Sequence, residues 1–519
     1  DFSTSTTVDR DRTVVVTIIA NNYFEIATKE DWKKFCGLVK KGQKNLNAKM
    51  TKDVDLGTEI IMAGERDIEY SGTFDGQGHT LKFNWTGDHT GWLAPFRYVK
   101  DVTIRNLRTK GKITSKGNWM SGLIDEVHGS VTISNCVSDV ALKCSYNDNP
   151  CGAAGMISYM TNEGIVTITD CIVKGDITAT TDECRKGIGG FVYGQHGTCT
   201  LTNCLYIGDN NATGGNTFAA NATVTNCYYL NACGSTQGTQ ISDAQLKSGE
   251  VAYKLQARRN NMVWGQDLNK DTEPLLTADD AKRVRKVDFT YNSQVRATRY
   301  ATHGNAIYGS MPTFTPKDLL GSDYNEHHYY SGIAFEDGFN GSTTVNTDRT
   351  VALTFNKKDY YEIASKENWK EFCDIVNGGQ NAVDAKLTRN IDLGSEINMV
   401  GDDNNKYSGT FDGQNHTLTL NWDAGYKSDI APFRRVDGAT IKNLRTEGEI
   451  KSSSHFLSGL VQSAYGNTTI SGCVSAVNIT STYDNGGCDA AGMVECVRDN
   501  ANVTFTDCLV KGKLNATTE

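Results

Sequence analysis

The segment Val131-Thr-Ile-Ser-Asn-Cys136 decides the fold, because close variants of it recur along the chain. The clearest are Val102-Thr-Ile-Arg-Asn-Leu107 and Val166-Thr-Ile-Thr-Asp-Cys171, and two further variants end at Cys204 and Cys227. Apolar and polar residues alternate in each segment, which is typical of a strand with one buried face. Successive matches are 23 to 35 residues apart, the scale of one coil of a parallel β-helix. The spacing therefore predicts an all-β fold of parallel β-helix type.

Gly-led apolar segments lie between these strands. They are Ser121-Gly-Leu-Ile, Ala154-Gly-Met-Ile and Gly189-Gly-Phe-Val. We expect them to form the other walls of each coil, with glycine at the bend because it tolerates unusual backbone angles.

The residue that ends each recurring strand is cysteine in most coils. We expect these side chains to stack inside as a structural ladder, with about 4.8 Å between neighbouring backbones. The polar residues just before the ladder are expected to stack at a turn and to bond backbone groups. A metal site would instead favour paired cysteines at Cys-x-x-Cys spacing, and the sequence has no such pair. The predicted ladder comprises Cys136, Cys171, Cys204, Cys227, Cys473 and Cys508.

A large internal duplication covers much of the chain. Residues 2–182, the first copy, recur as residues 339–519, the second copy, at a constant offset of 337. Tyr70-Ser-Gly-Thr-Phe-Asp-Gly-Gln-Gly-His returns as Tyr407-Ser-Gly-Thr-Phe-Asp-Gly-Gln-Asn-His. A constant offset indicates duplication of a whole module, and we expect the 519 residues to be part of a longer array.

Each copy contains one amphipathic helix near its start. Thr28-Lys-Glu-Asp31 has the residues of a helix start, and Gly42 is a stop signal. Between them Trp32, Phe35, Cys36 and Val39 form one apolar stripe, which predicts a helix that covers the first coil. The stripe recurs at Trp369, Phe372, Cys373 and Val376.

The Tyr70–His79 segment, the Ala94-Pro-Phe wall and the repeated Ile-Ser-Asn-Cys pattern resemble the GLUG-type right-handed β-helix repeats of bacterial surface proteins. Similar repeats accompany some immunoglobulin-A-protease-like proteins. Arg299-Tyr-Ala-Thr-His-Gly-Asn-Ala resembles the small β-grasp repeats of bacterial adhesins. The resemblance implies four parts. They are the end of a truncated β-grasp-like module at 1–18, a right-handed β-helix with its capping helix at 22–280, a β-grasp-like module at 285–355, and a truncated second β-helix at 358–519.

Charge and hydropathy exclude some classes of protein. The net charge is −9, whereas nucleic-acid binding requires basic patches. No run of 18 apolar residues is present, so we expect no membrane-spanning segment.

No motif predicts catalysis, and we expect no enzyme activity and no cofactor. Asp75-Gly-Gln resembles a phrase of polysaccharide-cleaving β-helix enzymes, but an aspartate beside glycine fits a turn. The residues Asp267, Asn269 and Asp271 have the opening spacing of a Ca²⁺ loop, yet Thr272 replaces its glycine and Ala278 its glutamate. They form only a weak metal candidate.

The sequence thus favours an extracellular stalk, filament or adhesin on a bacterial surface. Its expected partners are further copies of itself or other surface proteins, with glycans or a host surface as further candidates. The alternative is a protein that binds or cleaves polysaccharide.

Overall fold

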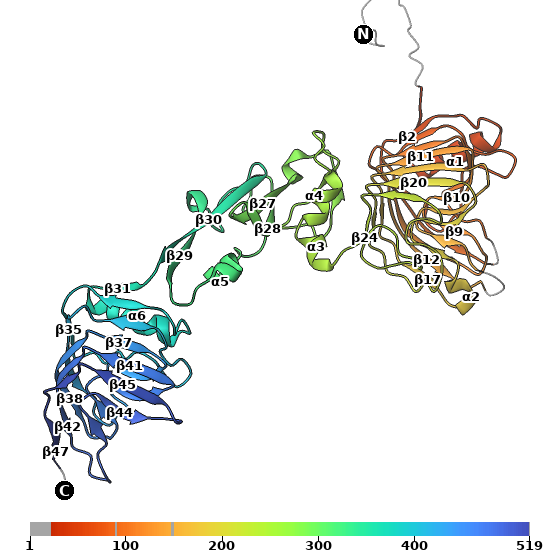
Figure 1. Ribbon diagram of the computed structural model, residues 1–519. Helices are drawn as coiled ribbons and strands as arrows, with labels where there is room; N and C mark the ends of the chain where they lie inside the picture. Colours follow the sequence, from red (N-terminus) through yellow and green to blue (C-terminus); the bar gives the residue numbers. More distant parts are fainter. Residues whose placement is uncertain (1–21, 89–90, 147–149, 518–519) are drawn as a thin grey trace, which may run out of the picture. The chain divides into compact units, whose positions relative to one another are not determined.

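The structure is a computed structural model that describes residues 22–88, 91–146 and 150–517. The module predicted at residues 1–18 lies outside the described residues. Strands predominate and helices are few (Figure 1). The chain divides into two compact units. The first contains the described residues up to Asp288, with Ala297–Met311 and Asn340–Thr350, and the second contains Phe289–Arg296, Pro312–Phe339 and the described residues from Val351 onward. This division falls inside the small module predicted at 285–355.

Four parallel sheets make up most of the first unit, and the chain visits them in turn. The first sheet has the order β1 (Phe24–Ile26), β2 (Ala48–Met50), β4 (Thr73–Asp75), β7 (Thr103–Arg105), β11 (Ser130–Ser134), β15 (Ile165–Thr169), β20 (Thr198–Thr202) and β22 (Thr223–Thr225). The second has the order β3 (Val54–Asp55), β5 (Thr80–Gly87), β8 (Arg108–Ser115), β12 (Val137–Cys144), β16 (Ile172–Val173), β21 (Leu205–Tyr206), β23 (Tyr228–Tyr229) and β24 (Thr239–Gln240), with β17 (Ile177–Ala179) also on β12. The third is β6 (Phe96–Lys100), β10 (Ile124–His128), β14 (Ile157–Met160) and β19 (Val192–Gln195), and the fourth is β9 (Met120–Ser121), β13 (Ala153–Ala154) and β18 (Ile188–Gly189).

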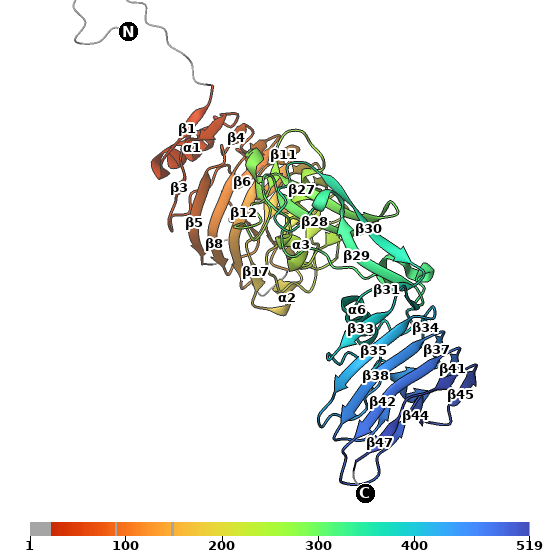
Figure 2. The ribbon, with the colours of Figure 1, turned by 90° about the vertical axis from the view of Figure 1, so that its left-hand side faces the viewer.

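Equivalent residues of the recurring segments lie side by side in the first sheet. Ile133 pairs with Ile168, and Ile168 pairs with Leu201. These side chains are fully buried, while the residues between them face outward. The strands predicted from the alternating segments are therefore confirmed, and so is their parallel pairing. In Figure 2 the strands β5, β8, β12 and β17 follow one another in order.

The Gly-led segments form the third and fourth sheets, but the reason for their glycines differs from the prediction. Gly122, Gly155 and Gly190 have ordinary backbone angles and are not needed for a bend. A Cβ on Gly155 would lie 2.3 Å from the Gly190 carbonyl oxygen and 2.3 Å from Val173 Cγ1. Glycine is required here because the next pass of the chain lies too close for a side chain.

The predicted helix is confirmed as α1 (Lys29–Lys40). Thr28 accepts a hydrogen bond from the Asp31 amide, and the Asp31 carboxylate accepts one from the Thr28 amide. All four stripe residues are buried. Trp32 packs edge-on against Phe74 and Phe96, with ring centroids 5.8 and 5.7 Å apart, so the helix covers the end of the stack near β1 (Figure 2).

Shorter elements follow the parallel sheets. The helix α2 (Asp182–Arg185) lies between β17 and β18, and α3 (Asp243–Lys247) and α4 (Glu250–Gln256) come after β24. The hairpin β25 (Trp264–Gly265) and β26 (Leu275–Leu276) and the turn η1 (Asp280–Lys282) follow. The next sheet has the order β28 (Gln294–Thr302), β27 (Val284–Tyr291), β30 (Arg349–Lys358) and β29 (Tyr329–Phe335), with α5 (Pro316–Leu320), η2 (Gly321–Asp323) and η3 (Glu336–Gly338) in its connections.

The second copy repeats the parallel sheets within the second unit. Its helix α6 (Lys366–Asn377) buries Trp369, Phe372, Cys373 and Val376, as predicted. The first sheet is β31 (Tyr361–Ile363), β32 (Ala385–Leu387), β34 (Thr410–Asp412), β37 (Thr440–Lys442), β41 (Asn467–Ser471) and β45 (Asn502–Thr506). The second is β33 (Ile391–Gly394), β35 (Thr417–Asp423), β38 (Arg445–Ser452), β42 (Val474–Ser481) and β46 (Leu509–Val510), with β47 (Leu514–Ala516) also on β42. The others are β36 (Phe433–Asp437), β40 (Val461–Tyr465) and β44 (Val494–Val497), and β39 (Leu457–Ser458) with β43 (Ala490–Ala491).

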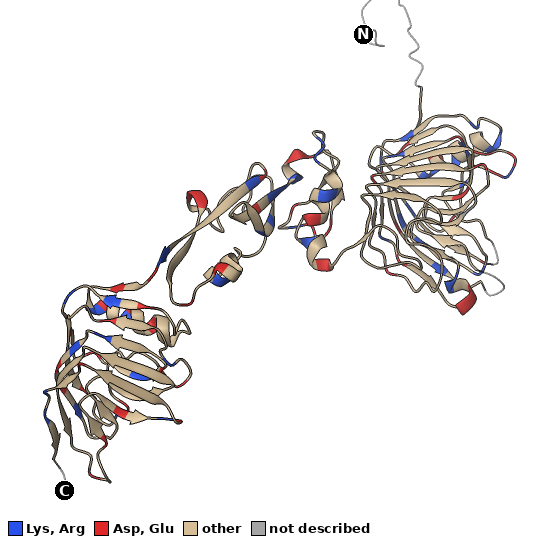
Figure 3. Cartoon of the chain, in the orientation of Figure 1, with Lys and Arg blue, Asp and Glu red and all other residues tan. Residues whose placement is uncertain are grey.

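Charged residues of both signs are interspersed over the described parts of the chain (Figure 3). None of the helices in the described ranges is both long and apolar enough to cross a membrane.

Candidate functional sites

The six predicted ladder cysteines occupy one repeated position at the end of first-sheet strands. Cys136, Cys171, Cys204, Cys227 and Cys473 are buried, and Cys508 is half-buried. Each thiol lies 3.3–3.4 Å from the carbonyl oxygen two residues earlier, as between Cys136 and Ser134. Burial raises the pKa of Cys171 and Cys204 well above the ordinary value, which keeps these thiols neutral and disfavours nucleophilic chemistry.

A polar ladder runs beside the cysteines. Its members Asn106, Asn135, Asp170, Asn203 and Asn226 all have positive φ between 50° and 54°. That left-handed conformation suits Asn and Asp at a tight turn. Asparagine side chains bond between neighbouring passes: the Asn135 amide donates to Asn106 at 3.3 Å and the Asn226 amide to Asn203 at 2.7 Å. Asn226 also donates to the Lys254 carbonyl oxygen at 3.0 Å, which is the expected bonding to a backbone group. Parallel in-register stacking places each amide next to its equivalent in the neighbouring pass.

Asp75 lies beside the first member of this ladder, since it pairs in register with Arg105, the residue before Asn106. Its carboxylate accepts hydrogen bonds from the Gln77 amide and the Asn106 side chain, both at 3.0 Å, and pairs with Arg105 at 2.8 Å. Hydrogen bonds from Asn106, Gln77 and Arg105 outweigh burial and lower the pKa of Asp75. Asp75 is therefore an ionised turn residue whose lone pairs are already engaged.

The segment after β24 that contains α3, α4 and β25 packs against the polar ladder at Asp170. Arg259 forms two hydrogen bonds of 2.8 and 2.9 Å with the Asp170 carboxylate, and the Trp264 indole donates a third at 2.7 Å. Asp170 is 5% exposed and Trp264 is fully buried. A paired and hydrogen-bonded buried carboxylate fixes this segment on the ladder.

This docking leaves a groove of about 470 Å³ within the first unit. Gln77, Asn106 and Asn135 line one side, and the segment around β25 and β26 lines the other. Arg108 reaches across it, with bonds to the Gly78 carbonyl oxygen at 3.0 Å and the Leu276 carbonyl oxygen at 3.4 Å. An open groove with amide and guanidinium donors is suited to a neutral polar ligand such as a sugar hydroxyl array.

The weak Ca²⁺ candidate lies in the turn after β25. Asp267 pairs with Lys270 at 3.1 Å, and Asp271 pairs with Lys282 at 3.0 Å. The Asn269 amide nitrogen donates to Asp267 at 3.1 Å. These carboxylates hold a turn through lysines and backbone amides, and a Ca²⁺ ion would have to replace those partners.

A buried carboxyl group that the sequence did not single out lies on β10. Asp125 is fully buried, and its Oδ1 atom accepts a 2.5 Å hydrogen bond from Ser158, while Oδ2 has no hydrogen-bond partner. Burial raises the pKa of Asp125 to about 7. The second copy has an amide, Gln462, at the equivalent position.

Three further cysteines gather at a corner of the first unit. Cys144 ends β12, Cys151 precedes β13, and Cys184 lies in α2; all three are fully buried. Their sulfur atoms lie within 4.8 Å of one another, and Cys144 and Cys184 are 2.9 Å apart. Hydrogen bonding with Cys144 and Cys151 lowers the pKa of Cys184. Sequence reasoning missed this group because its members are 7 and 33 residues apart, outside any short metal-binding motif.

Comparisons with known proteins add little to this geometry. No family model and no curated protein matches the chain. A solved structure described as "a putative immunoglobulin A1 protease from Bacteroides ovatus" is similar over 50% of this chain and 93% of its own, at 15% identity and a TM-score of 0.38.

Proposed function

We propose that this chain is an extracellular structural or adhesive protein of a bacterial surface. In this proposal its parallel sheets are right-handed β-helices of the GLUG type, and residues 285–355 are a β-grasp-like module between them. One observation carries the proposal: the two copies have the same strand register. Trp85 pairs with Ile113 on β8 in the first copy, and Trp422 pairs with Ile450 on β38 in the second. Stacking the same pass of the chain repeatedly is a way to build length.

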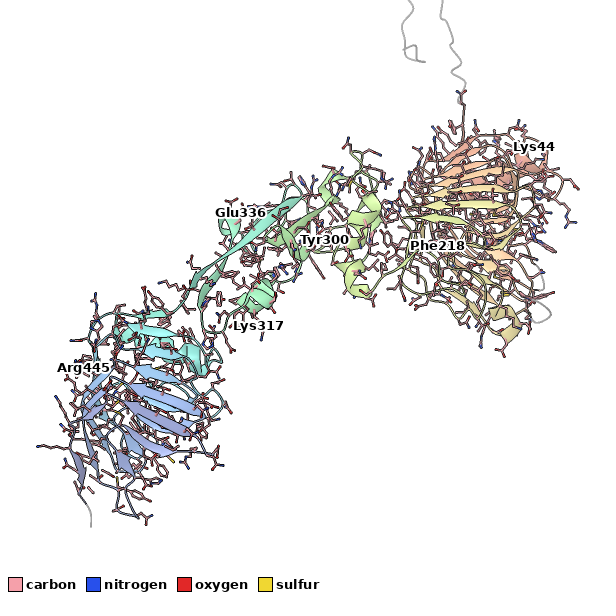
Figure 4. All side chains as sticks on the ribbon, in the orientation of Figure 1. Lys44, Phe218, Tyr300, Lys317, Glu336 and Arg445 are labelled. Atoms are coloured by element: carbon pink, nitrogen blue, oxygen red, sulfur yellow. The ribbon has the colours of Figure 1, made fainter. Side chains whose placement is uncertain are left out.

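On one pair of equivalent strands, β8 and β38, the two copies share a buried residue and differ on the outer face. Thr109 and Thr446 are equivalent and both 1% exposed. One residue further, the outward Lys110 is replaced by Glu447, and Lys112 by Glu449. Arg445, which is labelled in Figure 4, is an exposed residue of β38 that is the same in both copies, since Arg108 is its equivalent. A duplicated scaffold that carries different surfaces supports a role in presenting several contact faces along one chain.

The test is surface display together with binding that involves no turnover. Antibodies against the purified chain should label intact cells of the organism that produces it, and brief protease treatment of whole cells should remove the signal. Purified protein should bind surfaces or glycans without releasing new reducing ends. Signal only after cell lysis, or product formation from a polysaccharide panel, would overturn the proposal.

The groove beside the polar ladder favours polysaccharide binding as a second candidate. Arg108→Ala removes the guanidinium that spans the groove, and it should weaken binding to a responsive glycan by about tenfold. Lys110→Ala, on the outward face of the same strand, is the matched control. Equal affinities of both variants and the parent chain would exclude the groove as the glycan site.

A further inference from the structure

The three cysteines at the corner of the first unit differ from the ladder cysteines in what they face. Ladder thiols point at backbone carbonyl groups, as Cys136 does with Ser134 and Ile104. The thiols of Cys144 and Cys151 also lie near carbonyl oxygens, of Gly117 at 3.7 Å and of Cys184 at 3.2 Å, but the three sulfur atoms of Cys144, Cys151 and Cys184 converge on one another from three separate segments. Within the ranges that the structure describes, they are the one group of three or more metal-type ligands this close together.

The second copy shows that packing does not demand a thiol at this corner. Ser481 stands at the position equivalent to Cys144, is 1% exposed, and donates to the Ser454 carbonyl oxygen at 3.1 Å. Cys488, the equivalent of Cys151, is half-buried. The same fold thus accommodates a hydroxyl where the first copy has the sulfur that completes the cluster.

The geometry is close to that of a metal–thiolate site. A metal–sulfur bond of about 2.3 Å places sulfur ligands about 3.8 to 4.0 Å from one another. The sulfurs of Cys144 and Cys184 are closer than this, at 2.9 Å, and all three sulfurs lie within 4.8 Å of one another. Shifts of about 1 Å, within the reach of a cysteine χ1 rotation, would equalise these separations.

Electrostatics gives the reason for a cation. Three thiolates within 4.8 Å of one another at a fully buried corner require a compensating positive charge, which a bound metal ion would supply. Soft thiolate ligands select Cu(I) and Zn²⁺ among the biological metals. We propose that Cys144, Cys151 and Cys184 form a binding site for one thiophilic metal ion of this class.

The corner is shaped to hold the ligands in place. Thr181 caps α2 by accepting from the Cys184 amide at 3.2 Å, and its hydroxyl donates to the Tyr146 carbonyl oxygen at 2.9 Å. A Cβ on Gly152 would lie 2.4 Å from Trp119, so the residue after Cys151 must be glycine. These contacts fix the segments that carry two ligands before any ion arrives.

The experiment titrates the whole chain, purified under reducing and metal-free conditions. Zn²⁺ is added against a chromophoric chelator, and Cu(I) is added separately without oxygen, to distinguish the two ions. We expect one tightly bound ion per chain for at least one of them. Cd²⁺ should produce the ultraviolet absorption of cadmium–thiolate bonds.

The main test variant is Cys144→Ser, because the second copy has serine at the equivalent position. It should weaken binding by about a hundredfold or more while the unfolding temperature stays within a few degrees. Cys136→Ala, which removes a ladder thiol, should leave the stoichiometry and affinity unchanged. Cys151→Ser provides a second ligand deletion if Cys144→Ser folds poorly.

Three outcomes would overturn the site. One is the absence of tight binding by the reduced chain for all three ions. Another is a stoichiometry that Cys144→Ser and Cys151→Ser both leave intact. The last is a native protein that is lighter by two hydrogens, with a Cys144–Cys184 disulfide, and that binds no metal after reduction.

Discussion

Asp125 gives the first unit a titratable group at its centre. Burial raises the pKa of this carboxyl to about 7, whereas an unfolded Asp ionises near 3.9. The native state therefore holds the proton more tightly than the unfolded state. The stability that the protonated Asp125 contributes is fully present below about pH 3.9 and is lost as the pH rises through about 7. The loss is on the order of 4 kcal/mol.

Asp125→Asn should remove this pH dependence. The amide keeps an oxygen acceptor for Ser158 and carries no charge, as Gln462 does in the second copy. We expect the variant to be more stable than the parent at about pH 8 and similar to it at about pH 4. Urea unfolding at both pH values measures the difference. Asp139→Asn, on the outer face of β12, is the control, and a parent stability that does not change with pH would contradict the raised pKa.

Two glycines test whether glycine is required because a side chain would collide with a neighbouring segment. A Cβ at Gly155 would collide with Gly190 and Val173, so Gly155→Ala should destabilise the first unit by about 1–3 kcal/mol. Gly37 lies inside α1, and no atom lies within 4 Å of the place that an alanine methyl would take, so Gly37→Ala should stabilise the unit by about 0.5–1 kcal/mol. Thermal unfolding of both variants checks the signs. If both substitutions changed the stability in the same direction, the close approach of Gly190 and Val173 to Gly155 would be contradicted.

The recurring strand motif made some residues predictable at this scale and left others hidden. Cys136 and Cys171 could be placed in one column because a parallel register aligns every equivalent position. Cys184 could not be placed beside Cys144, because the path of the chain through α2 depends on loop contacts that have no repeat. Asp125 and Ser158 are equivalent positions of two Gly-led segments, because Ile124 pairs with Ile157, so the same register could have revealed their contact.

At the scale of elements, the docked segment after β24 depends on one buried ion pair. Removing either Asp170 or Arg259 takes away the counter-ion of the other. Asp170→Ala or Arg259→Ala should each cost about 3–5 kcal/mol. The double variant should cost clearly less than the sum, because it leaves no unpaired charge. Urea unfolding of the four proteins forms the cycle, and additive losses would show that the pair does not hold the segment.

Helices were easier to anticipate than this docking. The stripe of Trp32, Phe35 and Val39 and the cap at Thr28 are local signals that do not depend on distant residues. The helices after residue 240 were also recognisable from their start residues and apolar pattern. Their attachment to the polar ladder was not, because Arg259 and Asp170 are 89 residues apart in the sequence.

At the scale of the molecule, duplication provides an internal control for the interior contacts that both copies share. Trp32 donates to the Ile61 carbonyl oxygen at 3.0 Å, and Trp369 donates to the Asn398 carbonyl oxygen at 2.9 Å. Each tryptophan also packs edge-on against two phenylalanines of its own unit. The same substitution can therefore be made in two equivalent environments that belong to different compact units.

Trp32→Ala and Trp369→Ala should consequently act on different unfolding transitions. Each removes a fully packed indole under a capping helix and should cost its own unit about 3–5 kcal/mol. If the units unfold independently, differential scanning calorimetry should show that each variant lowers one transition and leaves the other in place. A double variant should lower both by the sum of the single effects. A single transition that moves equally in both variants would instead mean that the two units unfold as one cooperative body, and an array of such units would then gain stability with every copy rather than only length.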